Sequence, residues 1–302
     1  MTYPDITATI GNTPIVALNR LAESLPGRVL AKLEMRNPCG SVKDRLGLAL
    51  IEDAERNRGL KPGMTLIEAT GGNTGIGLAF VAAVRSYRLV LTMPETMSTE
   101  RVALLEHLGA RVELTPGILM TGAVRRAREL ANEIPGAILL DQFANAANPQ
   151  MHRQTTAVEI LNTIKEKIDV FVCAVGTGGT LTGVGEVLKK RNPKMRIVAV
   201  EPDGAAVLSG KAPGKHSMPG IGVGFIPAVL NRSLIDEVIA VSDQDAFEAT
   251  RKLARLEGIL AGISSGAAVH AALGVAAQLP DATVLTILPD GAERYITTDL
   301  FR

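Results

Sequence analysis

The sequence lacks tryptophan and has few aromatic side chains, since Phe, Trp and Tyr together make up 3% of the residues. It therefore offers no row of rings on which nucleic-acid bases stack. Charge of one sign is also lacking, because 32 Lys and Arg stand against 31 Asp and Glu and leave a formal net charge of +1. This balance creates no general attraction to nucleic acid or to an anionic membrane, and we expect neither as a partner.

Cysteine and long apolar runs are scarce as well. The two cysteines, Cys39 and Cys173, and the four histidines show no paired spacing of the kind that marks a zinc site or a disulfide framework. The first residues contain no basic segment followed by an apolar run, and no stretch is long enough to span a bilayer. We therefore expect no metal site, no targeting signal, no membrane association and a cytoplasmic location.

The sequence does contain short runs rich in Val, Ile and Leu that alternate with longer helix-periodic stretches. This alternation predicts an α/β fold with largely parallel sheets flanked by helices. Two strand–helix–strand units stand out, and they lie far apart in the chain, which indicates two lobes. Their predicted strands cover residues 65–68, 89–93, 170–175 and 196–200, and their predicted helices cover 76–84 and the run that carries Leu181, Val184 and Leu188.

One lysine follows a turn and begins an apolar helix. The segment Asn37 to Arg45 places Lys43 directly before the helical run Leu46 to Ile51. Near the positive end of a helix and partly shielded from water, the charged form of a lysine is disfavoured, and the neutral amine reacts with aldehydes. A given lysine is more often a solvated surface residue, so this interpretation depends on the neighbouring motifs.

Two glycine-rich loops each join a predicted strand to a predicted helix. In the loop 176–180, Gly-Thr-Gly-Gly-Thr, several backbone N–H groups precede a helix dipole and predict a phosphate site. The alternative is a tight turn that needs glycine only for its dihedral angles. The loop 70–75, Thr-Gly-Gly-Asn-Thr-Gly, offers N–H groups and hydroxyls to a carboxylate. The alternative interpretation of this loop is a helix N-cap, in which Asn73 or Thr74 bonds to the free N–H groups of the helix.

Two common enzyme patterns are incomplete. No pair of glycines spaced i, i+2 has a small residue at i+5, so the dinucleotide-binding fingerprint is missing and a nicotinamide dehydrogenase is disfavoured. The segment 262–266 matches the Gly-x-Ser-x-Gly pattern of serine hydrolases, in which an acid and then a histidine follow the serine. Here all four histidines precede Asp290, and no acid lies between Ser264 and His270, so that triad cannot be assembled.

The most specific feature is a series of short motifs spread over nearly the whole chain. They are Gly11 to Pro14, Asn37 to Arg45, Gly72 to Gly75, Met93 to Ser98, Gln142-Phe143, Gly176 to Thr180, Gly220 to Gly222 and Gly262 to Gly266. In this order they resemble the cysteine synthases (O-acetylserine sulfhydrylases), a family of fold-type II pyridoxal-phosphate enzymes. The resemblance implies a two-lobed, tryptophan synthase β-like fold. Residues 35–148 would form a smaller lobe that carries Lys43 and the substrate loop, and residues 1–34 plus 149–302 a larger lobe that carries the phosphate loop.

The resemblance also implies pyridoxal 5′-phosphate as the cofactor and a role for each motif. Lys43 would bind the cofactor aldehyde and act as the catalytic base, Asn73 would contact the ring hydroxyl, and Ser264 would face the ring nitrogen. A serine hydroxyl does not hold that nitrogen protonated as a carboxylate would, which favours elimination over transamination. The implied phosphate-binding residues are Gly176, Thr177, Gly178, Gly179 and Thr180, and the implied substrate-binding residues are Thr70, Gly71, Gly72, Thr74, Gln142 and Gly222.

The implied activity is that of a transferase or thiol-lyase that converts O-acetylserine and sulfide to cysteine and acetate, in a homodimer with serine acetyltransferase as a partner. A relative with another activated serine or nucleophile, such as an O-phosphoserine sulfhydrylase or a cystathionine β-synthase-like enzyme, shares the same cofactor residues. A non-catalytic regulator that binds a partner protein is a further alternative. Gly71 stands where the family usually has serine, so we expect a weaker or altered amino-acid preference with the cofactor site intact.

Overall fold

The computed structural model describes residues 2–117 and 120–302, which form two compact units. Of the described residues, unit 1 comprises 2–10, 37–117 and 120–148, and unit 2 comprises 11–36 and 149–302. Residue 1 and residues 118–119, which fall within the predicted ranges 1–34 and 35–148, lie outside the described residues. The predicted ranges group the first residues with the C-terminal half, whereas here they belong to unit 1, because the short helix η1 (Ile6–Thr9) contacts α2 (Asn73–Val84).

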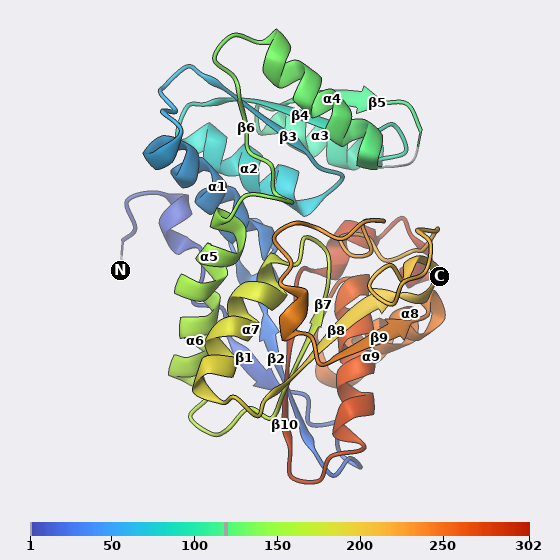
Figure 1. Cartoon of the computed structure of the whole chain (residues 1–302). Coiled ribbons are helices and arrows are strands. Elements are labelled where there is room, and N and C mark those ends of the chain that lie inside the picture. Colours follow the sequence, from blue (N-terminus) through green and yellow to red (C-terminus); the bar gives the residue numbers. More distant parts are fainter. Residues whose placement is uncertain (1, 118–119) are drawn as a thin grey trace. The chain divides into compact units, whose positions relative to one another are not determined.

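Unit 1 is built on a parallel sheet. Within the described residues its strand order is β5-β4-β3-β6, and every pairing is parallel. Figure 1 shows α4 on one face of this sheet and α1 and α2 on the other. The strands are β3 (Thr65–Ala69), β4 (Arg88–Pro94), β5 (Arg111–Thr115) and β6 (Ile138–Leu139), and the other helices are α1 (Lys43–Asn57), α3 (Thr99–His107) and α4 (Met120–Glu133).

Unit 2 is built on a larger sheet with the strand order β1-β2-β10-β7-β8-β9 in the described part of the chain. Only β1 runs antiparallel to its neighbour there, and the other pairings are parallel. The strands are β1 (Ile15–Ala17), β2 (Arg28–Leu33), β7 (Val170–Ala174), β8 (Arg196–Pro202), β9 (Glu237–Val241) and β10 (Thr283–Leu288). The helices are α6 (Thr156–Thr163), α7 (Gly179–Arg191), α8 (Asp243–Lys252) and α9 (Ile263–Ala276), and α5 (Ala147–Gln154) begins in unit 1 and continues into unit 2.

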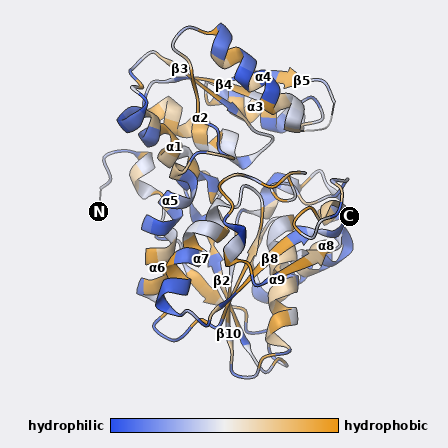
Figure 2. Cartoon of the chain, viewed as in Figure 1, coloured by the Kyte–Doolittle hydropathy of each residue, from blue (hydrophilic) through white to orange (hydrophobic). Residues whose placement is uncertain are grey.

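The alternation of side chains along β7 shows how helices on both faces bury this sheet. Val170 and Val172 belong to one buried cluster together with α9, whereas Phe171 and Cys173 belong to a second cluster together with α7. Successive side chains of a strand point to opposite faces, so a strand buried on both faces reads as a continuous apolar run. Figure 2 shows β8 and α9 mainly in hydrophobic colours, in keeping with this burial.

The predicted fold class is confirmed: both units are α/β, with largely parallel sheets flanked by helices. The predicted strand 65–68 is β3 and the predicted strand 170–175 is β7, each within one residue at its end. Among residues 2–117 and 120–302, no helix has both the length and the apolar character that crossing a membrane requires.

Candidate active site

Lys43 is the first residue of α1 and is half-buried. The turn before it passes through Gly40, whose φ is +76°. The carboxylate of Asp44 accepts a hydrogen bond from the backbone N–H of Cys39 at 2.6 Å, and the Lys43 N–H donates to Ser41 Oγ at 3.2 Å. These bonds tie the turn to the first helical residues, so the backbone that carries the lysine is held in place.

Two glycines bring α1 into backbone contact with α2. A Cβ atom at Gly47 would overlap the peptide group of Gly77, and a Cβ atom at Gly77 would overlap the carbonyl of Lys43. Any larger residue at either position would force the two helices apart, because a backbone atom cannot move aside as a flexible side chain can. The start of α1, with Lys43, is therefore packed directly on the first turns of α2, the helix that follows the loop 70–72.

The loop at the end of β3 contains the predicted substrate-binding residues. The Thr70 N–H donates to the carbonyl of Thr92 at 3.0 Å, and Arg101 Nη1 on α3 donates to the carbonyl of Gly71 at 3.1 Å. Helix α2 starts at Asn73, and its N-cap is Gly72, which has no side chain to cap the helix. The capping role considered for Asn73 or Thr74 is therefore not the one found here.

Gly71 faces two methionine side chains. A Cβ atom at this position would lie 3.1 Å from Met97 Sδ and 3.5 Å from Met120 Sδ. Both contacts are with the ends of flexible side chains, which can shift by a few tenths of an ångström. The space for a serine side chain is thus reduced but not closed.

We expect Gly71→Ser to lower the half-saturating concentration of the amino-acid substrate by up to about fivefold, since one neutral hydrogen bond is worth about 1 kcal/mol. Steady-state kinetics with varied O-acetylserine measure this change. Gly71→Ala is the matched control, because it adds the same Cβ atom next to Met97 without the hydroxyl. Equal constants for the serine and alanine variants would show that the hydroxyl contributes nothing.

Gln142 meets the substrate loop at the edge of the sheet. Strands β3 and β6 are parallel neighbours, so the segments that follow them emerge at the same edge. The Gln142 Nε2 donates to the carbonyl of Ala69 at 2.8 Å, and its Oε1 accepts from Thr74 Oγ1 at 2.8 Å. Unit 1 therefore joins Gln142 to the loop 70–74 and packs the backbone of Lys43 on the helix that follows this loop, so that a cluster of predicted residues forms from three parts of the chain.

The sequence analysis missed Glu68, the fourth residue of β3, which bonds to the backbone of Gln142. Its side chain is 1% exposed and accepts hydrogen bonds from the backbone N–H groups of Ala69 at 3.1 Å and Gln142 at 3.2 Å. Burial raises the pKa of Glu68 to about 8, and the negative charge of Asp141 acts in the same direction, while hydrogen bonds from the backbone N–H groups of Gln142, Ala69 and Asp141 oppose the shift. The signal that could have found it is a single acid near the end of an otherwise apolar strand.

The raised pKa makes the free energy of unfolding depend on pH. The folded protein holds the Glu68 proton more tightly than the unfolded chain does, and this tighter binding stabilises the fold. The stabilisation is complete below pH 4.5 and is lost as the pH rises through about 8. Between pH 5 and pH 9, wild type should lose on the order of a few kcal/mol of stability relative to Glu68→Gln, because only wild type carries the titrating group. Denaturant unfolding of both proteins at several pH values tests this, and parallel pH profiles would contradict it.

In unit 2, the loop 176–180 fits a phosphate group. A Cβ atom at Gly176 would overlap the carbonyl oxygen of Gly220, and Gly178 has a φ of +83° and lies against Leu230. Gly178 is also the N-cap of α7, so the first N–H groups of a 13-residue helix follow the loop. Small residues, left-handed backbone and the positive end of a helix are the features that anion-binding loops share.

A buried histidine, His152, contacts the last residue of this loop. The sequence analysis gave this histidine no such role. Thr180 Oγ1 lies 3.1 Å from His152 Nε2, and His152 Nδ1 lies 2.9 Å from Thr156 Oγ1. His152 is 3% exposed. The contact joins residues 28 positions apart, and no spacing pattern in the sequence marks it.

Ser264 and Gly222 lie near the same edge of the unit 2 sheet. The Gly222 N–H donates to the carbonyl of Val175 at 3.1 Å, next to the phosphate loop. Ser264 is the second residue of α9 and is 3% exposed. The Gly262 N–H just before α9 donates to the carbonyl of Asp290 at 2.9 Å, beyond the end of β10, which is a parallel neighbour of β7. Unit 2 thus brings Gly222 to the phosphate loop and Ser264 to the carboxyl edge of the same sheet.

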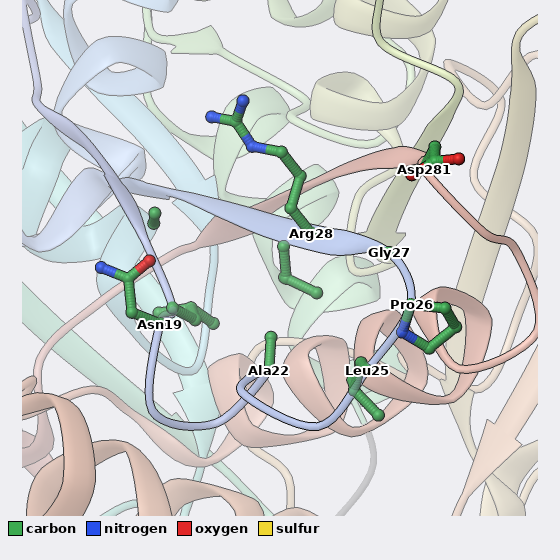
Figure 3. A pocket seen from close by; sticks show the side chains of 10 residues that line it. Asn19, Ala22, Leu25, Pro26, Gly27, Arg28 and Asp281 are labelled. Atoms are coloured by element: carbon green, nitrogen blue, oxygen red, sulfur yellow. The ribbon is translucent and has the colours of Figure 1, made fainter.

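A separate pocket of unit 2 has a volume of about 440 Å³. Ten residues line it, several of them labelled in Figure 3: Ala17, Leu18, Asn19, Ala22, Leu25, Pro26, Gly27, Arg28, Val29 and Asp281. Arg28 Nη1 also forms an ion pair with Glu166 at 3.0 Å. Among the described residues, none of the predicted site residues lines this pocket, so it lies outside the candidate site.

Comparison with known proteins shows to which family this chain belongs. The model of the family described as "Pyridoxal-phosphate dependent enzyme" matches residues 6–290. The chain is 51% identical over 300 residues to a cysteine synthase of Staphylococcus aureus (strain Mu50), a similarity that covers 98% of this chain and 96% of that protein.

Solved structures agree with this similarity. A cysteine synthase of Entamoeba histolytica has a TM-score of 0.95 at 41% identity and covers 100% of this chain and 91% of its own. An O-ureido-L-serine synthase has a TM-score of 0.96 at 45% identity and covers 100% of this chain and 96% of its own. The chain therefore shares both fold and extensive sequence with enzymes that differ in the reaction they carry out.

Proposed function

Because the chain belongs to the family of pyridoxal-phosphate dependent enzymes, we propose that it is a cysteine synthase that converts O-acetylserine and sulfide to cysteine and acetate. The 51% identity to a cysteine synthase over nearly the whole chain supports this activity. The observation that carries the proposal is the cluster in unit 1. There Lys43 packs on the helix that follows the loop 70–72, and Thr74 bonds to Gln142 at 2.8 Å.

When bound, pyridoxal phosphate withdraws electrons from the α-carbon of an amino acid and so permits loss of the group on the β-carbon. In this proposal Lys43 Nζ would hold the cofactor through its aldehyde and would serve as the base that accepts the α-proton of the substrate. Lys43 is the first residue of α1 and is half-buried, and both tasks use its amine in the neutral form.

The loop of unit 1 is proposed to hold the α-carboxylate of the substrate. The Thr70 N–H is bonded to the carbonyl of Thr92, so Thr70 is proposed to contribute its hydroxyl. Gly71, Gly72 and Thr74 are proposed to contribute backbone N–H groups, and Gln142 a side-chain amide. A Gln side chain has two N–H donors, and one of them is used on the carbonyl of Ala69. The second is proposed to bind the carboxylate. Asn73, the first residue of α2, is proposed to contact the cofactor ring hydroxyl.

Residues of unit 2 are proposed to hold the phosphate and the ring nitrogen. Gly176, Thr177, Gly178, Gly179 and Thr180 bind the phosphate through N–H groups and hydroxyls, with the dipole of α7 adding to the attraction. The Ser264 hydroxyl is proposed to bond to the ring nitrogen, and Gly222 to contact the substrate. A neutral hydroxyl at the nitrogen suits elimination and addition at the β-carbon.

The test of this function is the visible absorption spectrum of the purified holoenzyme. Addition of O-acetylserine without sulfide should change the absorption of the bound cofactor, and sulfide should restore the original band and release cysteine. A protein whose cofactor ignores O-acetylserine but responds to O-phosphoserine would be a sulfhydrylase for that substrate. A protein that responds to no activated serine would refute the proposed activity and favour a regulatory, partner-binding role.

We also propose a homodimer, serine acetyltransferase as a partner protein, and a cytoplasmic location. Cys39 and Cys173 are not joined in a disulfide in the described part of the chain, which suits a reducing compartment. Light scattering of the purified protein gives the mass of the assembly, and titration with serine acetyltransferase tests the partner.

A further inference from the structure

Glu68 is a buried acid that the proposed chemistry does not use. It lies on β3, between β4 and β6 in the sheet, and is 1% exposed. Its neighbours Ile67 and Ala69 belong to the apolar cluster formed with α4. Because side chains alternate along a strand, Glu68 points to the opposite face of the sheet. A buried carboxyl group costs free energy unless its oxygens are hydrogen-bonded, so its contacts merit a physical explanation.

Glu68 joins two segments that are distant in sequence. Its Oε1 accepts from the N–H of Ala69 at 3.1 Å, and its Oε2 accepts from the N–H of Gln142 at 3.2 Å. The chain turns sharply just before Gln142, where Asp141 has a φ of +56°. The carboxyl group therefore holds this turn against the end of β3.

The side chain of Gln142 is oriented by the same two segments. Its Nε2 donates to the carbonyl of Ala69 at 2.8 Å, and its Oε1 accepts from Thr74 Oγ1 at 2.8 Å. Glu68 thus holds the backbone of both Ala69 and Gln142, the two residues whose relative position determines where the Gln142 amide points. A shift of this turn would move the amide group and the Thr74 hydroxyl together.

We propose that Glu68 is a positioning residue for substrate binding: by holding the N–H groups of Ala69 and Gln142, it fixes the Gln142 amide in the orientation that receives the substrate carboxylate. This inference rests on the proposed function, which assigns the carboxylate to the loop 70–74 and Gln142. A neutral Glu68 also avoids repulsion between its own carboxyl group and the carboxylate of the substrate. Its pKa of about 8 keeps the proton on it at neutral pH. Asp141 is the charged neighbour that contributes to this shift.

Titration of the holoenzyme with O-acetylserine in the absence of sulfide, followed by the absorption of the bound cofactor, measures substrate binding. Glu68→Ala should raise the half-saturating concentration about tenfold, because two N–H groups lose their acceptor and the turn is released. Glu68→Gln keeps one acceptor oxygen and should raise it only about threefold. The value of kcat at saturating substrate should change less than the half-saturating concentration in both variants.

A double-mutant cycle separates positioning from a general loss of stability. In a Gln142→Ala background, Glu68→Ala should still lower the melting temperature but should cause no further rise in the half-saturating concentration, since the amide that it positions is gone. The same tenfold factor in both backgrounds would overturn the proposal and leave Glu68 with a purely structural role.

Glu55→Gln is the matched control in the same unit. Glu55 accepts from Arg85 Nη1 at 2.7 Å and from the Tyr87 hydroxyl at 2.9 Å, so its loss should lower the melting temperature without changing substrate binding. If wild type does not respond to O-acetylserine, the proposed function fails, and the titrations are repeated with O-phosphoserine and with cysteine, which carry the same carboxylate. Equal binding of every responding amino acid by wild type and Glu68→Ala would then overturn the inference by itself.

Discussion

We expect Lys43→Ala to abolish the formation of cysteine while the protein stays folded. Loss of a positioned base alone typically costs a factor of about 10² to 10⁴ in rate, and this variant also loses the amine that binds the cofactor aldehyde. Alanine is favourable in helices, so the start of α1 should remain intact. Turnover of O-acetylserine and sulfide, with circular dichroism as the measure of folding, tests both parts.

Reduction with borohydride gives an independent readout of the same assignment. In wild type it should attach the cofactor permanently to the peptide that contains Lys43, and mass spectrometry should find no such attachment in Lys43→Ala. Lys61→Ala is the control, because Lys61 is an exposed lysine of the same unit. Full turnover in the Lys43 variant would show that the catalytic lysine has been assigned wrongly.

The second large effect is expected at Gly176. A side chain there would overlap the carbonyl of Gly220, so Gly176→Ala forces one of two backbone segments to move. Charge-assisted hydrogen bonds are worth about 1.5–3 kcal/mol each, and misplacing two of them should weaken cofactor binding by at least about two orders of magnitude. Titration of the apoprotein with pyridoxal phosphate, followed by absorbance, measures the dissociation constant.

Two further variants separate the phosphate loop from general effects of glycine replacement. Gly274 lies in α9, and a Cβ atom there would meet open space, so Gly274→Ala should leave cofactor binding unchanged and stabilise the helix by about 1 kcal/mol. Thr177→Val keeps every loop glycine and removes one hydroxyl, and it should weaken binding by about fivefold to tenfold. Wild-type affinity in both Gly176→Ala and Thr177→Val would exclude this loop as the phosphate site.

The local elements could be predicted from the sequence because their causes are local. The run Val170 to Val175 is apolar without a break, and it forms β7 (Val170–Ala174) with apolar clusters on both faces. The basic residues Lys189, Lys190 and Arg191 occupy the last turn of α7, where they complement the negative end of the helix. Lys43 likewise begins α1, as its position after a turn indicates.

Contacts between distant segments were decided only by the tertiary structure. Glu68 and Gln142 are separated by 74 positions, and Thr180 and His152 by 28. The first pair meets because β6 pairs with β3, so a strand late in unit 1 lies beside the strand that comes first there. Crossover connections permit several strand orders for the same apolar runs, so no local pattern specifies this neighbour.

The sequence by itself determined which residues are proposed to carry the chemistry, because residue type, turn composition and helix position are properties of short segments. Lys43, the loop 70–75 and the loop 176–180 could all be recognised in this way. Only the tertiary structure decided how those residues are held: Gly47 and Gly77 join α1 to α2, and burial gives Glu68 a pKa of about 8. Backbone contact and desolvation exist only after distant segments have packed together.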